Sequence, residues 1–170
     1  PNSMMILQRR PASVKAFRLA TGAISGEGSL IDPAMKAMIT LVASRVAGCP
    51  YVLAHAAHAV LHAGAEAKLA AIHDYRNSAL FSAKEKLTLD YAFATASVPC
   101  AVTDDMVRDM RSHWSDEELV DITSLIALYG FFDRWNAANV TPLEAEPLDV
   151  AQKYLGPHGW KPGRHAPSPA

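Results

Sequence analysis

Hydrophobic residues recur every three or four positions along most of the chain, and no stretch alternates polar and apolar residues over the length of a strand. Spacings of three and four place apolar side chains on one face of an α-helix, whereas strict alternation indicates a β-strand. The pattern is clearest after Glu118, in Leu119, Ile122, Leu125, Ile126, Tyr129 and Phe132. It predicts an all-α fold of about six to eight helices, with a long central helix that begins near Ser115.

Capping residues divide the chain into predicted elements. Asp32 followed by Pro33 favours a helix start, because the aspartate can accept from an unpaired amide and proline needs no partner at the first helical position. Ser82 with Glu85 has the spacing of a capping box, as do Ser115 and Glu118. We expect helices at about 13–25, 33–48, 50–64, 66–76 and 82–98, a shorter one after Thr103, the long one after Ser115, and a short one near 150–155.

The same pattern suggests one domain with two arms. The chain has 170 residues, close to the usual size of a single domain. We expect an N-terminal arm at 1–12, the helical domain at 13–145 and a C-terminal arm at 146–170. Apolar residues thin out beyond Pro142, and five prolines follow from Pro147 onward. The C-terminal arm is therefore predicted to wrap around the domain or to be partly disordered.

Charge and hydrophobicity limit the classes of molecule that the protein is expected to bind. Sixteen basic against seventeen acidic residues give a net charge of −1, and no basic stripe is present, so nucleic acid is not expected to bind. The longest apolar stretch, 119–132, is too short to cross a bilayer, which predicts no membrane span. Two cysteines cannot form a disulfide framework and are expected to be reduced thiols in a cytoplasmic protein. A small-molecule substrate is expected, and no cofactor.

The helix predicted at 50–64 carries an unusual row of side chains. Tyr51, His55, His58 and His62 fall within an arc of roughly 60° on a helix that has no Asp, Glu, Lys or Arg. Buried imidazoles need hydrogen-bond partners or a bound ion, so the row indicates either a working site or a polar subunit boundary. His55, His58 and His62 could together ligate one metal ion. The sequence offers no obvious nearby carboxylate to orient their rings, which disfavours the metal.

Cys49 lies between Gly48 and Pro50 at the predicted start of that helix. Unpaired amides and the positive end of the helix dipole stabilise a thiolate there, which favours a reactive thiol. The alternative is a small buried hydrophobic residue, the role expected for Cys100. The aromatic residues near the end of the long helix could form core or the apolar wall of a ligand pocket; they are Tyr129, Phe131, Phe132 and Trp135.

The segment Ser-Arg-Val-Ala-Gly-Cys-Pro-Tyr-Val-Leu-Ala-His at 44–55, followed by Gly64, resembles the carboxymuconolactone decarboxylase superfamily, which includes the alkylhydroperoxidase AhpD. Segments 101–104, 114–120 and 134–140 resemble the superfamily in the same order, so the likeness covers roughly 10–145. It implies an all-α fold whose protomers associate as dimers, trimers or hexamers, with the site beside the cysteine-bearing helix.

The site departs from the peroxidase pattern. Peroxidatic members carry Cys-x-x-Cys-x-x-x-His with a glutamate on the preceding helix. Cys49 matches the first cysteine, but Val52, Ala56 and Ala37 stand at the other three positions. Other members carry Tyr-x-x-x-His without a second cysteine, and Tyr51 with His55 matches that form. The resemblance thus implies a peroxidase-related, antioxidant oxidoreductase or a lyase-like enzyme that transfers protons on a small molecule.

We therefore expect the pocket at the junction of helices 33–48, 50–64 and the long helix, with Cys49 and His55 bordering one cavity. Cys49 is the candidate thiolate and His55 the candidate general acid or base. Tyr51 is also assigned to the catalytic set, and the substrate-binding set is His58, Tyr129 and Trp135. The alternative is a non-catalytic helical homo-oligomer that binds a ligand or metal through Tyr51, His55, His58 and His62.

Overall fold

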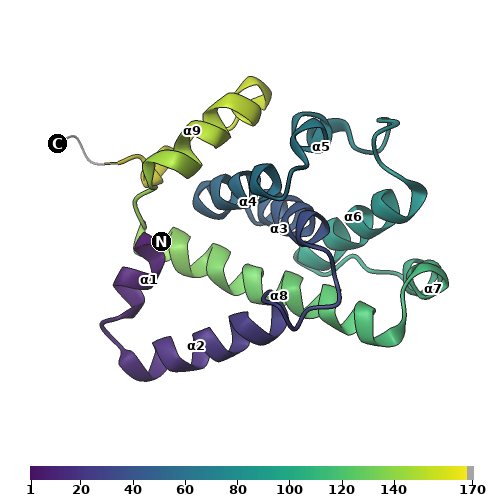
Figure 1. Cartoon of the computed structure of the whole chain (residues 1–170), viewed down its shortest axis with the longest axis horizontal. Helices are drawn as coiled ribbons and strands as arrows, with labels where there is room; N and C mark the ends of the chain where they lie inside the picture. The colour runs from purple at the N-terminus through teal and green to yellow at the C-terminus, as the bar shows by residue number, and fades with distance from the viewer. Residues whose placement is uncertain (168–170) are drawn as a thin grey trace.

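A computed structural model describes residues 1–167, and over that range every regular element is a helix, as predicted (Figure 1). The α-helices are α1 (Asn2–Leu7), α2 (Pro11–Ile24), α3 (Pro33–Ala47), α4 (Pro50–His62), α5 (Glu66–Ala71), α6 (Ala83–Ala96), α7 (Asp104–His113), α8 (Asp116–Asn139) and α9 (Ala145–Tyr154). Three short 3-10 helices are η1 (Ile72–Asp74), η2 (Gly156–His158) and η3 (Gly163–His165).

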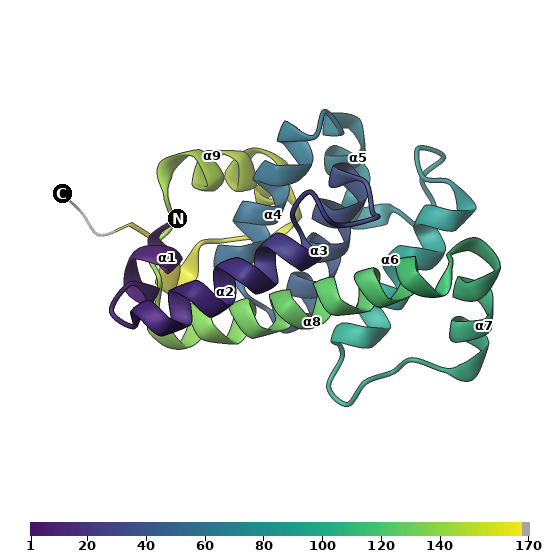
Figure 2. The same cartoon turned by 60° about the horizontal axis from the view of Figure 1, so that its bottom comes forward.

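Helices α3 and α8 form the centre of the molecule. Figure 1 shows α8 crossing the middle, with α2 along one side and α3 and α4 on the other, and Figure 2 shows α2 beside α8 from a second direction. Helix α3 packs against α4, α6 and α8, and every residue from Ala37 to Ser44 is buried. A helix that is apolar on all sides belongs in a core, and α3 supplies one wall of the site described below.

The predicted helix starts are confirmed. The Asp32 side chain accepts a hydrogen bond from the Met35 amide at 3.0 Å, and both capping boxes are formed, at Ser82 and at Ser115. Gly48 ends α3 in the left-handed region with φ +69°, where a glycine avoids the steric cost of a Cβ atom. These local signals fix the turn from α3 into α4, and therefore the place where the histidine-bearing helix begins.

Four element predictions need correction. Residues Asn2–Leu7 form a helix where only an arm was expected, and α2 begins at Pro11, ahead of Ser13. The helix after Glu66 ends at Ala71 and continues as a 3-10 turn. Helix α9 begins at Ala145, about five residues earlier than expected. Pro147 lies in its first turn, where the missing amide costs no intrahelical hydrogen bond, so this proline does not break the helix.

The C-terminal segment folds back on the domain as far as Pro167. Of the two predicted alternatives, wrapping or partial disorder, the segment up to Pro167 wraps around the domain. Helix α9 packs on α4, as Figure 1 shows. The Leu143 amide donates to the His165 carbonyl at 2.9 Å, and His165 Nδ1 lies 2.7 Å from the Thr141 carbonyl. Residues 168–170 lie outside the described part, and the three-part division at 12 and 145 stays a prediction. None of the helices within 1–167 is long and apolar enough to cross a membrane.

Candidate functional site

His55 on α4 faces a carboxylate from the far end of the chain. Its Nε2 lies 2.7 Å from Oε2 of Glu144, which immediately precedes α9. The other oxygen, Oε1, accepts from the Tyr51 hydroxyl at 2.9 Å and from the Asn2 amide. One carboxylate therefore joins two side chains that lie one turn apart on α4. We call this set the Tyr51/Glu144/His55 network.

Burial and hydrogen bonding set the protonation state of the network. Burial lowers the pKa of His55 below its usual 6.5, and the nearby Glu144 charge opposes this only in part. Burial alone would raise the pKa of Glu144, but hydrogen bonds and His55 outweigh it, so that this pKa lies below its ordinary value. Burial raises the pKa of Tyr51. At neutral pH the network thus holds a carboxylate, a neutral imidazole and a phenol.

This protonation state selects the His55 tautomer. A carboxylate can only accept, so the Nε2 atom that contacts it must carry the hydrogen. Nδ1 is then unprotonated, with a lone pair that has no hydrogen-bond partner among residues 1–167. A carboxylate that holds a neutral imidazole in one tautomer prepares the other nitrogen to take a proton.

A cavity of about 580 Å³ lies at the predicted junction of α3, α4 and α8. We call it the main cavity. The apolar part of its wall is mostly alanine, with Pro33 and Leu125, and its polar side chains are Ser25, Glu27, Lys36, Thr40, His55, His62 and Tyr129. The Lys36 ammonium donates to the carbonyls of Ser25 and Gly26 at 2.9 and 3.1 Å, which places a positive charge at the wall beside the end of α2. Such a cavity suits a small, mostly apolar molecule.

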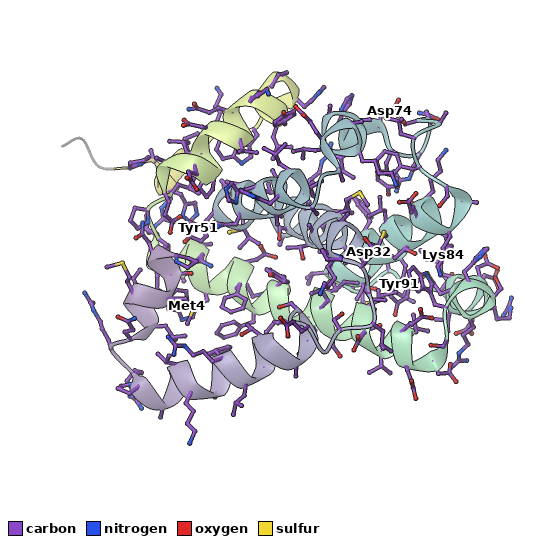
Figure 3. The ribbon with its side chains drawn as sticks, viewed as in Figure 1. Met4, Asp32, Tyr51, Asp74, Lys84 and Tyr91 are labelled. Atoms are coloured by element: carbon purple, nitrogen blue, oxygen red, sulfur yellow. The ribbon has the colours of Figure 1, made fainter. Side chains whose placement is uncertain are left out.

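His55 also lines a second, smaller cavity of about 210 Å³, which shares Ser25 and Tyr129 with the main cavity. Tyr51 and Met4 are among its walls, and Figure 3 places these two residues at the same end of the molecule, where α1 approaches α4. The imidazole therefore lies between two hollows. Of the predicted substrate-binding residues, Tyr129 lines both hollows, whereas His58 and Trp135 line neither.

Cys49 does not share these cavities. It is the residue that precedes α4, only 1% of its surface is exposed, and it lines neither hollow. Burial raises the pKa of its thiol to about 11, although the backbone amides of Val52 and Tyr51 lower it in part. The predicted common cavity and the stabilised thiolate are therefore wrong. Six residues rotate a helix by about 240°, which turns Cys49 away from the face that carries His55.

His58 and His62 form a pair of their own, with their Nε2 atoms 3.0 Å apart. Glu146 Oε2 lies 3.6 Å from His58 Nε2. Within 1–167 no group of three or more His, Cys, Asp or Glu is arranged to hold a metal ion. The expectation that no carboxylate lies near the rings is wrong, since Glu144 and Glu146 both do. The sequence shows two acidic residues at the start of α9, but it does not indicate which helix they face.

Two other expectations change. Cys100 is exposed, although a packing role was expected. Phe131 is 38% exposed and stacks on Phe17 of α2 with ring centroids 4.5 Å apart, so part of the aromatic group holds α2 on α8 at the surface. Tyr129 alone of the four named aromatic residues lines the main cavity. Phe132 lines the second cavity together with Tyr129, so the group divides into surface packing and pocket wall.

An all-α domain with a tyrosine and a histidine one turn apart, beside a cavity at the cysteine-bearing helix, defines an AhpD-like class of protein. The model of the carboxymuconolactone decarboxylase family matches residues 11–94. The chain belongs to the carboxymuconolactone decarboxylase/AhpD-like superfamily.

Three relatives show how far this likeness extends. The solved apo structure of the debrominase Bmp8 is 25% identical with a TM-score of 0.84, covering 91% of this chain and 83% of that one. An uncharacterized peroxidase-related protein with an alkylhydroperoxidase AhpD core, from Ralstonia eutropha, is 19% identical with a TM-score of 0.77, covering 86% and 78%. The uncharacterized protein YnjA of Escherichia coli is 28% identical over 124 residues, covering 72% of this chain and 68% of that protein.

Proposed function

We propose that the protein is an enzyme that transfers a proton to or from carbon on a small, mostly apolar carbonyl compound bound in the main cavity. The observation that carries this proposal is the 2.7 Å contact between Glu144 and His55, on an imidazole that lines a 580 Å³ cavity. His55 Nδ1 is the general base, and Glu144 holds the ring and stabilises its charged form after it takes the proton. Tyr51 is a positioning residue, since its hydroxyl fixes the carboxylate.

The relatives support this class of chemistry. A decarboxylation leaves an electron-rich carbon that must take up a proton, so a family with a decarboxylase in its name needs a proton donor beside a small-molecule pocket. A variant of the debrominase Bmp8 was solved in complex with 2,3,4-tribromopyrrole, so that relative binds a small, mostly apolar ring compound. In the present chain the same protonated His55, formed in the first step, can return its proton to carbon.

Thiol chemistry of the peroxidase type is the second candidate, and one observation favours it. The Cys49 sulfur lies close enough to the backbone amides of Val52 and Tyr51 for them to lower its pKa in part. Burial works against this candidate because it raises that pKa to about 11, and a protonated thiol is a poor nucleophile. Proton transfer at His55 is therefore the function we favour.

Deuterium uptake at carbon tests the proposal. Small β-keto acids and unsaturated lactones would be incubated with the protein in D₂O and followed by NMR. His55→Gln is expected to slow the catalysed exchange by about 10²-fold or more, the usual loss for a general base. The rate should stay flat down to and below the ordinary histidine pKa of 6.5 and fall only at lower pH, because the pKa of His55 is lowered and only the neutral ring accepts a proton. His113→Gln, at the exposed end of α7, is the matched control.

Glu144→Gln gives a sharper outcome. Its amide can present NH₂ to His55 Nε2, which then becomes the acceptor and moves the ring hydrogen to Nδ1. We expect exchange to slow by at least tenfold and the ¹⁵N shifts of His55 to report the other tautomer. Peroxide consumption that survives in His55→Gln but disappears in Cys49→Ser would favour the thiol candidate. Binding of these compounds without exchange or peroxide consumption would favour the non-catalytic one.

A further inference from the structure

A third cavity lies on the other side of α4. Its volume is about 190 Å³, and we call it the Arg45/Trp160 cavity. Leu53 belongs to its wall, and on a helix this residue points about 160° away from His55, two positions further on. Four aliphatic side chains contribute to the lining: Leu41, Leu53, Ile72 and Leu155. The cavity is therefore separate from the site of the proposed function and has an apolar lining of its own.

The polar side chains of this cavity can all donate hydrogen bonds. They belong to Arg45, His73, His158 and Trp160, and the lining includes no carboxylate. Arg45 forms no ion pair within residues 1–167. A guanidinium is always charged and presents a fork that matches a carboxylate. The cavity thus carries positive charge without a described partner.

Trp160 adds a second observation that points to a ligand. Its Nε1 atom is buried and has no hydrogen-bond partner among the described residues. An indole N–H can only donate, and leaving a buried donor unpaired costs about 1–3 kcal/mol. Buried donors in folded proteins are nearly always satisfied, so an acceptor in the cavity would remove this cost.

Two histidines fix the rim. The rings of His73 in η1 and His158 in η2 are stacked with centroids 3.5 Å apart and an angle of 18° between their planes. This stack joins the α5–η1 segment to the turn after α9. It holds Trp160, two residues beyond His158, against the hydrophobic core. Three of the four donors, His73, His158 and Trp160, are therefore held by packing contacts, which reduces the entropy cost of binding.

We propose that the Arg45/Trp160 cavity binds a small monocarboxylate with a compact apolar body. The carboxylate accepts from the Arg45 guanidinium and from Trp160 Nε1, while the body packs on the four aliphatic side chains. Inorganic anions would leave that apolar surface wet, and a neutral analogue would leave Arg45 without an ionic partner. The volume of 190 Å³ is below the range of drug-sized pockets, which limits the ligand to a compact one.

Benzoate is the probe, and the indole N–H signals of the full-length protein are the readout. The three tryptophans give three such signals, and Trp160→Phe identifies the one from Trp160. We expect benzoate to shift this signal saturably, and benzamide and inorganic phosphate to shift it at least tenfold less at equal concentration. Arg45→Met should weaken benzoate binding at least tenfold, whereas Arg18→Met, an exposed arginine on α2, should leave it unchanged.

Three results would overturn the proposal. One is equal binding of benzoate and benzamide, and another is unchanged affinity in Arg45→Met, which alters an exposed side chain and should fold normally. The third is a benzoate effect on the His55 signals with the Trp160 signal unmoved, which would place the ligand in the main cavity. His55→Gln should bind benzoate normally, so failure of the proton-transfer proposal leaves this one testable on its own.

Discussion

Glu144 accepts hydrogen bonds from an amide, a phenol and an imidazole, whereas both oxygens of Asp133 on α8 are buried and have no partner within residues 1–167. The same chemical group therefore has opposite properties at these two positions. Burial raises the pKa of Asp133 to about 7, while the pKa of Glu144 is lowered. Hydrogen bonds to the charged form, not burial alone, decide which carboxyl is ionised.

The substitution Asp133→Asn tests whether burial keeps this carboxyl group protonated. The pKa rises from 3.8 to about 7 on folding, so between these values the folded state holds more protons and wild-type stability falls as pH rises. A rise of about three in the pKa of one carboxyl group lowers the free energy of unfolding by about 4 kcal/mol at most, once the group is ionised. We expect Asp133→Asn to exceed the wild type in free energy of unfolding by up to about 4 kcal/mol at pH 8, with the difference shrinking towards pH 4.

Urea unfolding at a series of pH values measures this difference. Asp109→Asn, at an exposed position of α7, is the control and should show the wild-type slope. An equal pH dependence in Asp133→Asn and the wild type would contradict the burial of an ionisable Asp133.

At the scale of elements, the turn from α3 to α4 depends on one backbone conformation. Gly48 has φ +69°, and a Cβ atom there would meet nothing within 4 Å, so the cost of Gly48→Ala is conformational alone. Gly22 lies inside α2 with equally open space and no positive φ. We expect Gly48→Ala to lower the free energy of unfolding by about 1 kcal/mol and Gly22→Ala to raise it by roughly 0.5–1 kcal/mol.

Chemical denaturation of the two variants checks the contrast. Because both substitutions add the same methyl group in open space, a difference in sign can come only from the backbone. If both substitutions changed the free energy of unfolding in the same direction, the backbone explanation would be contradicted.

At the scale of the whole molecule, the C-terminal segment completes the site. His165 is 3% exposed, its Nδ1 lies 2.7 Å from the Thr141 carbonyl, and its ring lies 5.8 Å from that of Tyr51. The contact with Thr141 holds the chain just before Glu144 against the C-terminal segment. We expect His165→Ala to cost about 1–3 kcal/mol through the lost buried hydrogen bond and to speed amide exchange in α9 more than in α3 or α8.

Hydrogen exchange followed by residue separates this local effect from general destabilisation. His113→Ala, at the exposed end of α7, should leave α9 protected. Uniform acceleration in all helices would mean that His165 supports the core, and not the segment that carries Glu144.

The sequence by itself determined the helices whose starts and ends are encoded within a few residues. Ser115, Asp32 and Gly48 act on neighbouring amides or on their own φ, so their roles could be predicted without knowing the rest of the chain. The row of Tyr51 and His55 on one face of α4 was predictable for the same reason. Periodicity fixes a side chain's direction about its own helix.

Only the tertiary structure decided what those side chains meet. Glu144 lies 89 residues beyond His55, and no local pattern indicates that α9 folds back on α4. The burial of Cys49 likewise depends on how α4 packs against the core, and desolvation outweighs the local influence of the helix amides. Protonation states depend on contacts between distant segments, and these arise only when the chain packs.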